Sequence, residues 1–182
     1  MSSIDSLEQA ILIRTIQGDE VATFRTLRLE ALRDNPTAFG ADYQQDINRP
    51  DSFGEVRVHN GQGDGDVVIY VAEDAGELVG MAGVYRPDNP KVRYSGTLWG
   101  VYVRPAWRGR GLGRQVSQAC VEWARAKGLD ILKLGVTIPN PPAVRCYESL
   151  GFRSYGIEPK TFMIAGQYYD LMRMFLELNK NG

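Results

Sequence analysis

The sequence contains few of the residues from which metal sites and disulfide frameworks are built. Its 182 residues include two cysteines, Cys120 and Cys146, and one histidine, His59. Two cysteines are too few for a disulfide framework or a structural zinc cluster, and a single histidine excludes most metal sites that depend on imidazole. The sequence therefore predicts a protein without a metal that keeps its thiols reduced.

Long hydrophobic runs and an excess of one charge are also missing. No stretch approaches the roughly 18 apolar residues of a membrane-spanning helix, and the first residues lack the basic start and apolar core of a signal peptide. The 21 Lys and Arg residues balance 22 Asp and Glu residues, which gives a formal net charge of -1. No overall field then attracts nucleic acid or an anionic membrane. We expect a cytoplasmic protein with neither as a partner, in which any anion site is local.

Length and composition are typical of one globular domain. The chain is 43% hydrophobic and 24% charged, which excludes disorder as its general state. A chain of this length is too short for two domains of ordinary size. We therefore expect a single domain over residues 1–182, with its core at about 11–176.

Hydrophobic periodicity predicts alternating strands and helices. Strands are expected at 11–16, 67–72, 78–85, 96–104, 131–138, 152–156 and 168–176, and helices at 21–33, 112–127 and 141–150. Asp19 is a candidate cap for the first helix, and 37–60 is expected to hold a loop with one or two short helices. This order predicts an α/β sandwich around one mixed sheet, with a parallel pair wherever a helix intervenes between strands.

A turn rich in glycine and arginine connects the strand at 96–104 to the helix at 112–127. It contains Arg108, Gly109, Arg110, Gly111, Gly113 and Arg114. Glycine permits a positive φ and a close approach of the backbone to a ligand. The first turn of a helix offers unpaired amides and partial positive charge, both of which suit a phosphate. The turn is interpreted either as a cradle for pyrophosphate or as a surface turn with solvated arginines; the P-loop pattern is absent.

The spacing of Arg108, Gly111 and Gly113 resembles the hallmark of the GNAT superfamily of acyl-CoA-dependent N-acetyltransferases, which is Gln or Arg, two residues, Gly, one residue, then Gly or Ala. The segment 101–105 is similar to the fourth strand of that family, and 140–152 fits its pattern before the sixth strand. The resemblance extends from about residue 13 to 175. It implies a mixed, mainly antiparallel sheet of six to seven strands flanked by helices, with a splayed V between strands four and five.

The resemblance also implies a reaction and a cosubstrate. The reaction is transfer of an acetyl group from acetyl-CoA to a primary amine of a small molecule or protein by direct attack, with no metal. The implied residues for acetyl-CoA are Val101, Tyr102, Val103, Arg108, Gly109, Arg110, Gly111, Leu112, Gly113, Arg114 and Asn140. The strand residues would hold the pantetheine arm, the 108–114 amides the pyrophosphate, and the amide at Val101 or a neighbour would polarise the thioester carbonyl.

Two of the implied residues also have a structural interpretation. Tyr147 matches the position at which this family can place a tyrosine that protonates the leaving thiolate. However, Ala143, Tyr147 and Leu150 share helical spacing, so Tyr147 can equally be a core aromatic residue. Asn140 precedes Pro141 and is a good helix N-cap, with or without a contact to CoA.

A general base is harder to identify. Many members of the family carry a glutamate on the fourth strand, but the strand at 96–101 has no carboxylate. The candidates are Glu73, Asp74, Asp42 and Asp46, or a chain of water molecules. The missing carboxylate leaves open a non-catalytic module that binds or senses acyl-CoA, and the arginines leave open a nucleotide-binding or nucleic-acid-binding domain.

The remaining interpretations concern the acceptor, the cysteines and the oligomer. Phe39, Tyr43 and Trp99 are candidates for lining a pocket for a small-molecule or peptide amine. Cys120 lies on the apolar stripe of the helix at 112–127 and is interpreted as inert core, and no histidine is placed to activate Cys146. By analogy with the family, a homodimer through the last strands is possible.

Overall fold

The computed structural model describes residues 10–179, which form one sheet of seven strands in the order β1-β2-β3-β4-β5-β7-β6. The strands are β1 (Leu12–Thr15), β2 (Val67–Asp74), β3 (Glu77–Tyr85), β4 (Ser95–Val103), β5 (Ile131–Ile138), β6 (Arg153–Ile164) and β7 (Gln167–Glu177). Of the described strands only β4 and β5 pair in parallel, with α4 between them. The expectation of a parallel pair wherever a helix intervenes is wrong for β1 and β2, which pair antiparallel although three helices separate them, because that connection returns to the end of the sheet at which β1 ends. The mixed, mainly antiparallel sheet predicted from the sequence is confirmed.

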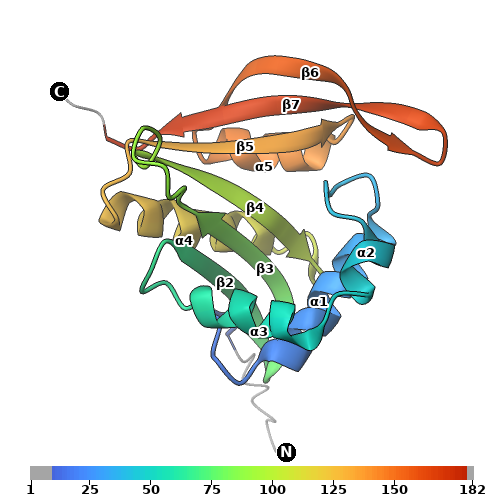
Figure 1. Ribbon diagram of the computed structural model, residues 1–182, viewed down its shortest axis with the longest axis vertical. Coiled ribbons are helices and arrows are strands. Elements are labelled where there is room, and N and C mark those ends of the chain that lie inside the picture. Colours follow the sequence, from blue (N-terminus) through green and yellow to red (C-terminus); the bar gives the residue numbers. More distant parts are fainter. Residues whose placement is uncertain (1–9, 180–182) are drawn as a thin grey trace, which may run out of the picture.

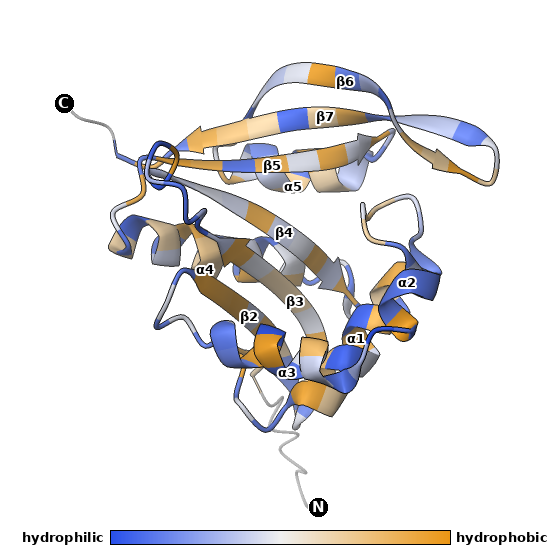
Figure 2. Ribbon diagram, viewed as in Figure 1, coloured by the Kyte–Doolittle hydropathy of each residue, from blue (hydrophilic) through white to orange (hydrophobic). Residues whose placement is uncertain are grey.

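Helices cover both faces of this sheet (Figure 1). One face carries α1 (Val21–Asp34), α2 (Tyr43–Ile47) and α3 (Asp51–Asn60), and the other carries α4 (Leu112–Ala126) and α5 (Pro141–Ser149). A short 3-10 helix (Pro105–Trp107) links β4 to α4. Each face has its own cluster of buried apolar side chains. The hydrophobic residues are concentrated on the central strands β2 and β3, which are buried between the two layers (Figure 2).

Helix α4 packs against the sheet along a hydrophobic stripe, as its periodicity predicts. Leu112, Val116, Cys120 and Trp123 are buried, and the fully buried Cys120 is confirmed as a core residue. The stripe ends one turn earlier than expected. Ala126, whose helical spacing from Trp123 predicts that it continues the stripe, is exposed, because the chain leaves the helix at Lys127 and turns at Gly128.

Strand β4 contains a β-bulge. Trp99 pairs with Gly83 and Tyr102 pairs with Met81, so two residues of β4 lie opposite the single residue Ala82 of β3. Gly100, the first residue of the bulge, has a φ of 68°, a value that glycine adopts without steric cost. The bulge changes which side chains of β4 face each helical layer.

Before it reaches the bulge, β4 separates from β5. The two strands pair only at Ser95 to Thr97, and the last of these pairs joins Thr97 to Lys133. From there the remainder of β5 pairs with β7 on its other side only. This divergence confirms the predicted V between the fourth and fifth strands.

Two local expectations differ from the structure. Asp19 does not cap α1; the N-cap is Glu20, which makes no side-chain cap bond and whose carboxylate is held by Arg14 at 2.6 Å. Strand β6 continues far beyond the expected residue 156 and ends at Ile164. Its pairing with β7 shifts register between Glu158 and Phe162, which lets it pass Pro159.

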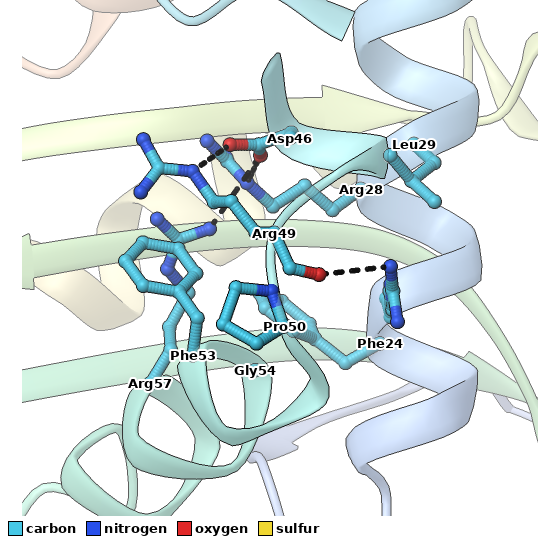
Figure 3. Close-up of a pocket in the computed structure, with 10 residues that line it drawn as sticks. Phe24, Arg28, Leu29, Asp46, Arg49, Pro50, Phe53, Gly54 and Arg57 are labelled. Atoms are coloured by element: carbon cyan, nitrogen blue, oxygen red, sulfur yellow. Dashed lines mark hydrogen bonds and ion pairs between the residues drawn. The ribbon is translucent and has the colours of Figure 1, made fainter. Parts of the chain in front are cut away.

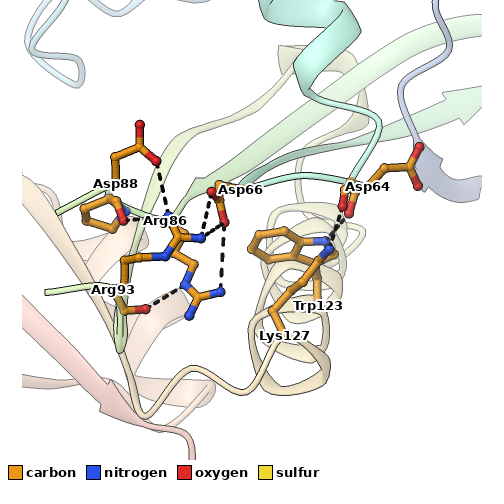
Figure 4. A network of polar contacts seen from close by, with 9 residues as sticks. Asp64, Asp66, Arg86, Asp88, Arg93, Trp123 and Lys127 are labelled. Carbon is orange, nitrogen blue, oxygen red and sulfur yellow. Dashed lines mark hydrogen bonds and ion pairs between the residues drawn. The ribbon is translucent and has the colours of Figure 1, made fainter. Parts of the chain in front are cut away.

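At the end of the sheet that lies opposite the opening of the V, polar contacts fasten the connections between strands (Figure 4). The guanidinium of Arg93 donates to both carboxylate oxygens of Asp66, at 2.8 and 2.9 Å. The indole of Trp123 on α4 donates to the carbonyl of Gly63 at 3.0 Å. The first contact joins the 61–66 loop to the connection between β3 and β4, and the second joins it to α4. Within residues 10–179, no helix combines the length and apolar character needed to cross a membrane.

Candidate functional site

A cleft of about 620 Å³ opens where β4 and β5 diverge, a volume in the usual range for small-molecule sites. Its walls come from the end of β4, the turn into α4, helix α5 and the segment that follows α1. The predicted site residues that line it are Val101, Tyr102, Val103, Arg108, Gly109, Gly111, Leu112, Gly113, Arg114, Asn140 and Tyr147. The structure therefore brings together all the predicted site residues except Arg110, whose side chain is exposed outside the lining.

The edge of β4 forms one wall of the cleft. Past Thr97 no residue of β4 pairs with β5 in the part of the chain that the structure describes. Val101 and Val103 pack against the core on the side of α4, and their main chain borders the gap. An unpaired strand edge of this kind can accept an extended ligand as if it were another strand.

The beginning of α4 forms the second wall. Its N-cap is Gly111, which has a left-handed backbone with a φ of 75° and no side-chain cap bond. Gly109 has a φ of 80°, and a Cβ built there would meet nothing within 4 Å. The first turn contains no acidic residue, so its amides and the helix dipole present uncompensated positive potential to the cleft. This wall suits an anion such as a pyrophosphate.

The arginines at this wall differ in the contacts that their side chains make. Arg108 folds back onto β4, where its Nε donates to the carbonyl of Val103 at 2.9 Å. Arg114 is exposed on the first turn of α4 and lines the cleft. Arg108 therefore shapes the mouth of the cleft, while Arg110 and Arg114 offer positive charge from the solvent side.

Helix α5 forms the third wall. Both residues predicted there have a structural role and also line the cleft. Asn140 is the N-cap of α5 and accepts a bond from the amide of Ala143 at 3.3 Å, so its capping role is confirmed, and it also lines the cleft. The ring of Tyr147 packs edge-to-face on Phe152, with 6.0 Å between centroids. It is thus a packing residue that also borders the cleft.

The hydroxyl of Tyr147 is suited to hold a proton. Burial raises its pKa, and the neighbouring Cys146 and Cys120 act in the same direction. No hydrogen bond joins this hydroxyl to another of the described residues 10–179. Burial likewise raises the pKa of Cys146, so its thiol stays protonated and is a poor nucleophile. His59 is exposed on α3.

None of the four acids considered as a base lines the cleft. Glu73 accepts a 2.7 Å bond from Arg14, and Asp74 accepts a 2.7 Å bond from the indole of Trp107. Asp42 caps α2, and Asp46 is buried among arginines. The residues that line the cleft include no carboxylate.

The three aromatic residues expected in an acceptor pocket are divided among separate hollows. Phe39 lines the cleft and also a second hollow of about 400 Å³, where Tyr43 lies across from the end of β6. Trp99 lines a third hollow, of about 420 Å³, between α3 and the sheet. A single pocket containing all three does not form.

A cluster of arginines on the helical layer near Trp99 was not predicted. Asp46 of α2 is buried, with 7% of its side chain exposed, and accepts a 2.7 Å bond from Arg28 of α1 and a 2.9 Å bond from Arg49. Arg57 of α3 lies 3.8 Å from the same carboxylate. Figure 3 shows the three guanidinium groups gathered around Asp46. Because these residues come from separate elements, no spacing in the sequence reveals them.

No metal site accompanies these features. Across residues 10–179, no group of three or more His, Cys, Asp or Glu side chains is arranged to hold a metal ion.

Comparison with known proteins places this geometry in a family. The model of the acetyltransferase (GNAT) family matches residues 25–152. An L-methionine sulfoximine/L-methionine sulfone acetyltransferase from Pseudomonas paraeruginosa is 31% identical over 146 residues, which cover 80% of this chain and 82% of that protein. A streptothricin acetyltransferase from Streptomyces lavendulae is 34% identical over 112 residues, covering 60% and 57% of the two chains.

Solved structures agree on the fold. A putative acetyltransferase from Salmonella typhimurium, determined with acetyl-CoA, superimposes with a TM-score of 0.79 at 24% identity and covers 96% of this chain and 97% of its own. A GCN5-related N-acetyltransferase from Kribbella flavida gives a TM-score of 0.77 at 25% identity, covering 93% and 99%. The chain with the V-shaped cleft and the glycine-capped α4 belongs to the GNAT family of acetyltransferases.

Proposed function

We propose that this GNAT acetyltransferase transfers the acetyl group of acetyl-CoA to the primary amine of a small molecule. The observation that carries the proposal is the convergence of three walls on one cleft: the open edge of β4, the glycine-capped start of α4, and Tyr147 on α5. Each wall matches one part of the cosubstrate or of the reaction.

The residues of the cleft bind acetyl-CoA by its different parts. Amides of the 108–114 turn bind the pyrophosphate, with Arg110 and Arg114 adding charge. The unpaired edge of β4 binds the pantetheine arm in the manner of an added strand. The main-chain amide at Val101 donates to the thioester carbonyl, where negative charge develops during the reaction.

The transfer itself needs one bond formed and one broken. The amine nitrogen attacks the carbonyl carbon of the thioester, the C–N bond forms, and the C–S bond breaks with its electrons remaining on sulfur. Tyr147 donates its proton to the leaving thiolate and regains one from water. Because no carboxylate lines the cleft, the amine reacts in its neutral form and its extra proton passes to water. Holding the two reactants together supplies much of the rate.

The comparisons favour a small acceptor over a protein. The relative that matches 80% of this chain is named for L-methionine sulfoximine and L-methionine sulfone, which are small amino-acid derivatives. A relative named N-alpha-acetyltransferase RimI, from Mycobacterium tuberculosis, matches 52% of this chain. The longer match supports a free small amine.

We also propose that the protein works in the cytoplasm and forms a homodimer. Both cysteines are free thiols, as is usual in a reducing compartment. The outer strand β6 carries exposed apolar side chains at Tyr155 and Ile157, and an unpaired edge strand of this kind can pair with a second copy. Light scattering at several protein concentrations tests the dimer: a mass of one chain throughout would contradict it.

The experiment for the activity is an acceptor screen. The protein is incubated with acetyl-CoA and either free amino acids, other small amines or short peptides, and both free CoA and N-acetylated product are measured. Product from small amines supports the proposal. Binding of acetyl-CoA without product from any amine would instead support a module that only binds acyl-CoA.

A further inference from the structure

Among residues 10–179, the charge of Arg57 has no hydrogen-bonded partner and only one long ion-pair contact, to Asp46. Its closest carboxylate oxygen, in Asp46, is 3.8 Å away, beyond hydrogen-bond distance. Among residues 10–179 no side-chain hydrogen bond of Arg57 is present. The guanidinium instead lies 4.5 Å from the ring centroid of Phe53 and 5.6 Å from that of Trp99.

Asp46 cannot supply the missing partner. Arg28 bonds to its Oδ2 and Arg49 to its Oδ1, so three guanidinium groups share one carboxylate whose oxygens are both occupied. Burial, reinforced by repulsion from Arg28 and Arg49 and partly offset by attraction to Asp46, lowers the pKa of Arg57 to about 10. Arg57 is therefore charged at neutral pH, and an external anion would complete the compensation of its charge.

The hollow next to Arg57 is apolar. It measures about 420 Å³ and shares Arg57 with the small hollow of about 30 Å³ under the arginine cluster (Figure 3). Its lining consists of Phe53, Val56, Arg57, Asn60, Val67, Tyr85 and Trp99. A ligand that fits here has an apolar body and one anionic group for the guanidinium.

This hollow borders the part of β4 at which acetyl transfer is proposed. Trp99 is the last residue before the bulge, and Val101, the proposed donor to the thioester carbonyl, is the second residue of the bulge. The indole of Trp99 lies so close to β3 that a Cβ at Gly83 would come within 2.6 Å of it. Trp99 therefore has a fixed position at the side of the hollow next to the bulge.

We propose that this hollow binds the acceptor amine, that Arg57 binds the acceptor's carboxylate, and that the acceptors are therefore amino acids with apolar side chains. The identity of the hollow as the acceptor site rests on the proposed acetyltransferase function. A carboxylate, with one negative charge, fits better than a phosphate because Arg57 alone offers a positive charge to the ligand, whereas Arg28 and Arg49 are engaged with Asp46. The apolar lining takes the side chain, which leaves the amine free to face the bulge.

The test measures binding and needs no turnover. N-acetyl-L-phenylalanine and N-acetyl-L-phenylalaninamide, which differ only in the carboxylate, are titrated by calorimetry into the full-length protein in excess CoA. We expect the acid to bind at least tenfold more tightly than the amide. Arg57→Met, which keeps the apolar stem, removes this preference, and Arg57→Lys, which keeps the charge without the fork, reduces it. Arg153→Met, on exposed β6, retains it.

Three outcomes would overturn the proposal: equal binding of acid and amide by the unaltered protein, binding of neither, or a preference that survives in Arg57→Met. The first two do not depend on any variant. Failure of the acetyltransferase function would give a different result. The acid would still bind more tightly than the amide, but no amine would release CoA from acetyl-CoA. The affinity for acetyl-CoA is expected to be the same in all three variants.

Discussion

Trp99 and Tyr102 lie on the same face of the sheet, although a regular strand would place residues three apart on opposite faces. Both pack against the cluster under α1 and α3, because the bulge at Gly100 inserts one residue between them. Val101 and Val103 in turn face the side of α4. A single strand therefore presents its open edge and two valines to the proposed acetyl-CoA cleft and two aromatic side chains to the opposite layer.

The glycine cap of α4 gives a prediction about acetyl-CoA affinity. Replacing Gly111 (φ 75°) with valine strains the left-handed backbone and adds bulk where amides must approach the pyrophosphate. We expect Gly111→Val to weaken acetyl-CoA binding by more than tenfold, which is about 1.4 kcal/mol. Calorimetric titration measures the change.

Gly128→Val is the matched control, because Gly128 has a similar φ of 70° at the other end of α4, where a Cβ meets nothing within 4 Å. It should destabilise the protein to a similar extent without changing the dissociation constant. If both variants bind acetyl-CoA like the unaltered protein, the glycine turn is not the cradle.

Tyr147 gives a prediction about turnover. Tyr147→Phe keeps the edge-to-face packing on Phe152 but removes the proton donor, and loss of a general acid costs about a hundredfold or more. Stopped-time assays of CoA release should show a lower kcat with little change in acetyl-CoA affinity or melting temperature. Tyr155→Phe, at an exposed residue of β6, serves as the control; equal kcat values for the two variants would remove Tyr147 from the mechanism.

The absence of a carboxylate from the cleft lining predicts the pH dependence. With no carboxylate in the cleft lining to act as a base, the rate follows the neutral fraction of the amine, so kcat/KM rises about tenfold per pH unit below the pKa of the acceptor. Burial raises the pKa of Tyr147, so its acid form persists and the profile does not fall at moderately alkaline pH. A profile measured from pH 6 to 9 on two amines of different pKa checks this. A plateau at the same pH for both would reveal a base in the protein.

The buried carboxylate of Asp46 predicts a large effect on stability. Asp46→Asn leaves the buried Arg28 and its two neighbours without a negative partner, and breaking a buried ion pair from one side costs about 3 kcal/mol or more. Urea unfolding should show this loss. Asp51→Asn, which removes the exposed partner of Arg25, should change the free energy of unfolding by less than about 1 kcal/mol. Similar values for the two variants would show that the arginine cluster does not depend on Asp46.

The parts of the fold that depend on local sequence could be predicted. The strand at Ile131–Ile138 has the expected bounds, and α4 begins at Leu112 directly after its glycine cap, because hydrophobic period and turn residues act over a few neighbours. The arrangement of the cleft followed from the family resemblance, which assigned roles to residues on β4, α4 and α5.

Features that depend on distant partners could not be predicted. Strand β6 runs past Pro159 because pairing with β7 outweighs the local breaker. Two of the acids considered as a base, Glu73 and Asp74, accept hydrogen bonds from residues far away in the sequence. Likewise, Arg57 contacts Trp99, far away in the sequence, because α3 packs over the sheet.

Titration of the purified protein with acetyl-CoA, with free CoA and ATP as controls, tests the central claim most directly. The account predicts micromolar binding of acetyl-CoA, weaker binding of ATP, and loss of the acetyl-CoA signal in Gly111→Val but not in Gly128→Val. Absence of acetyl-CoA binding, or binding of ATP with equal affinity, would contradict the assignment of the cleft to acetyl-CoA.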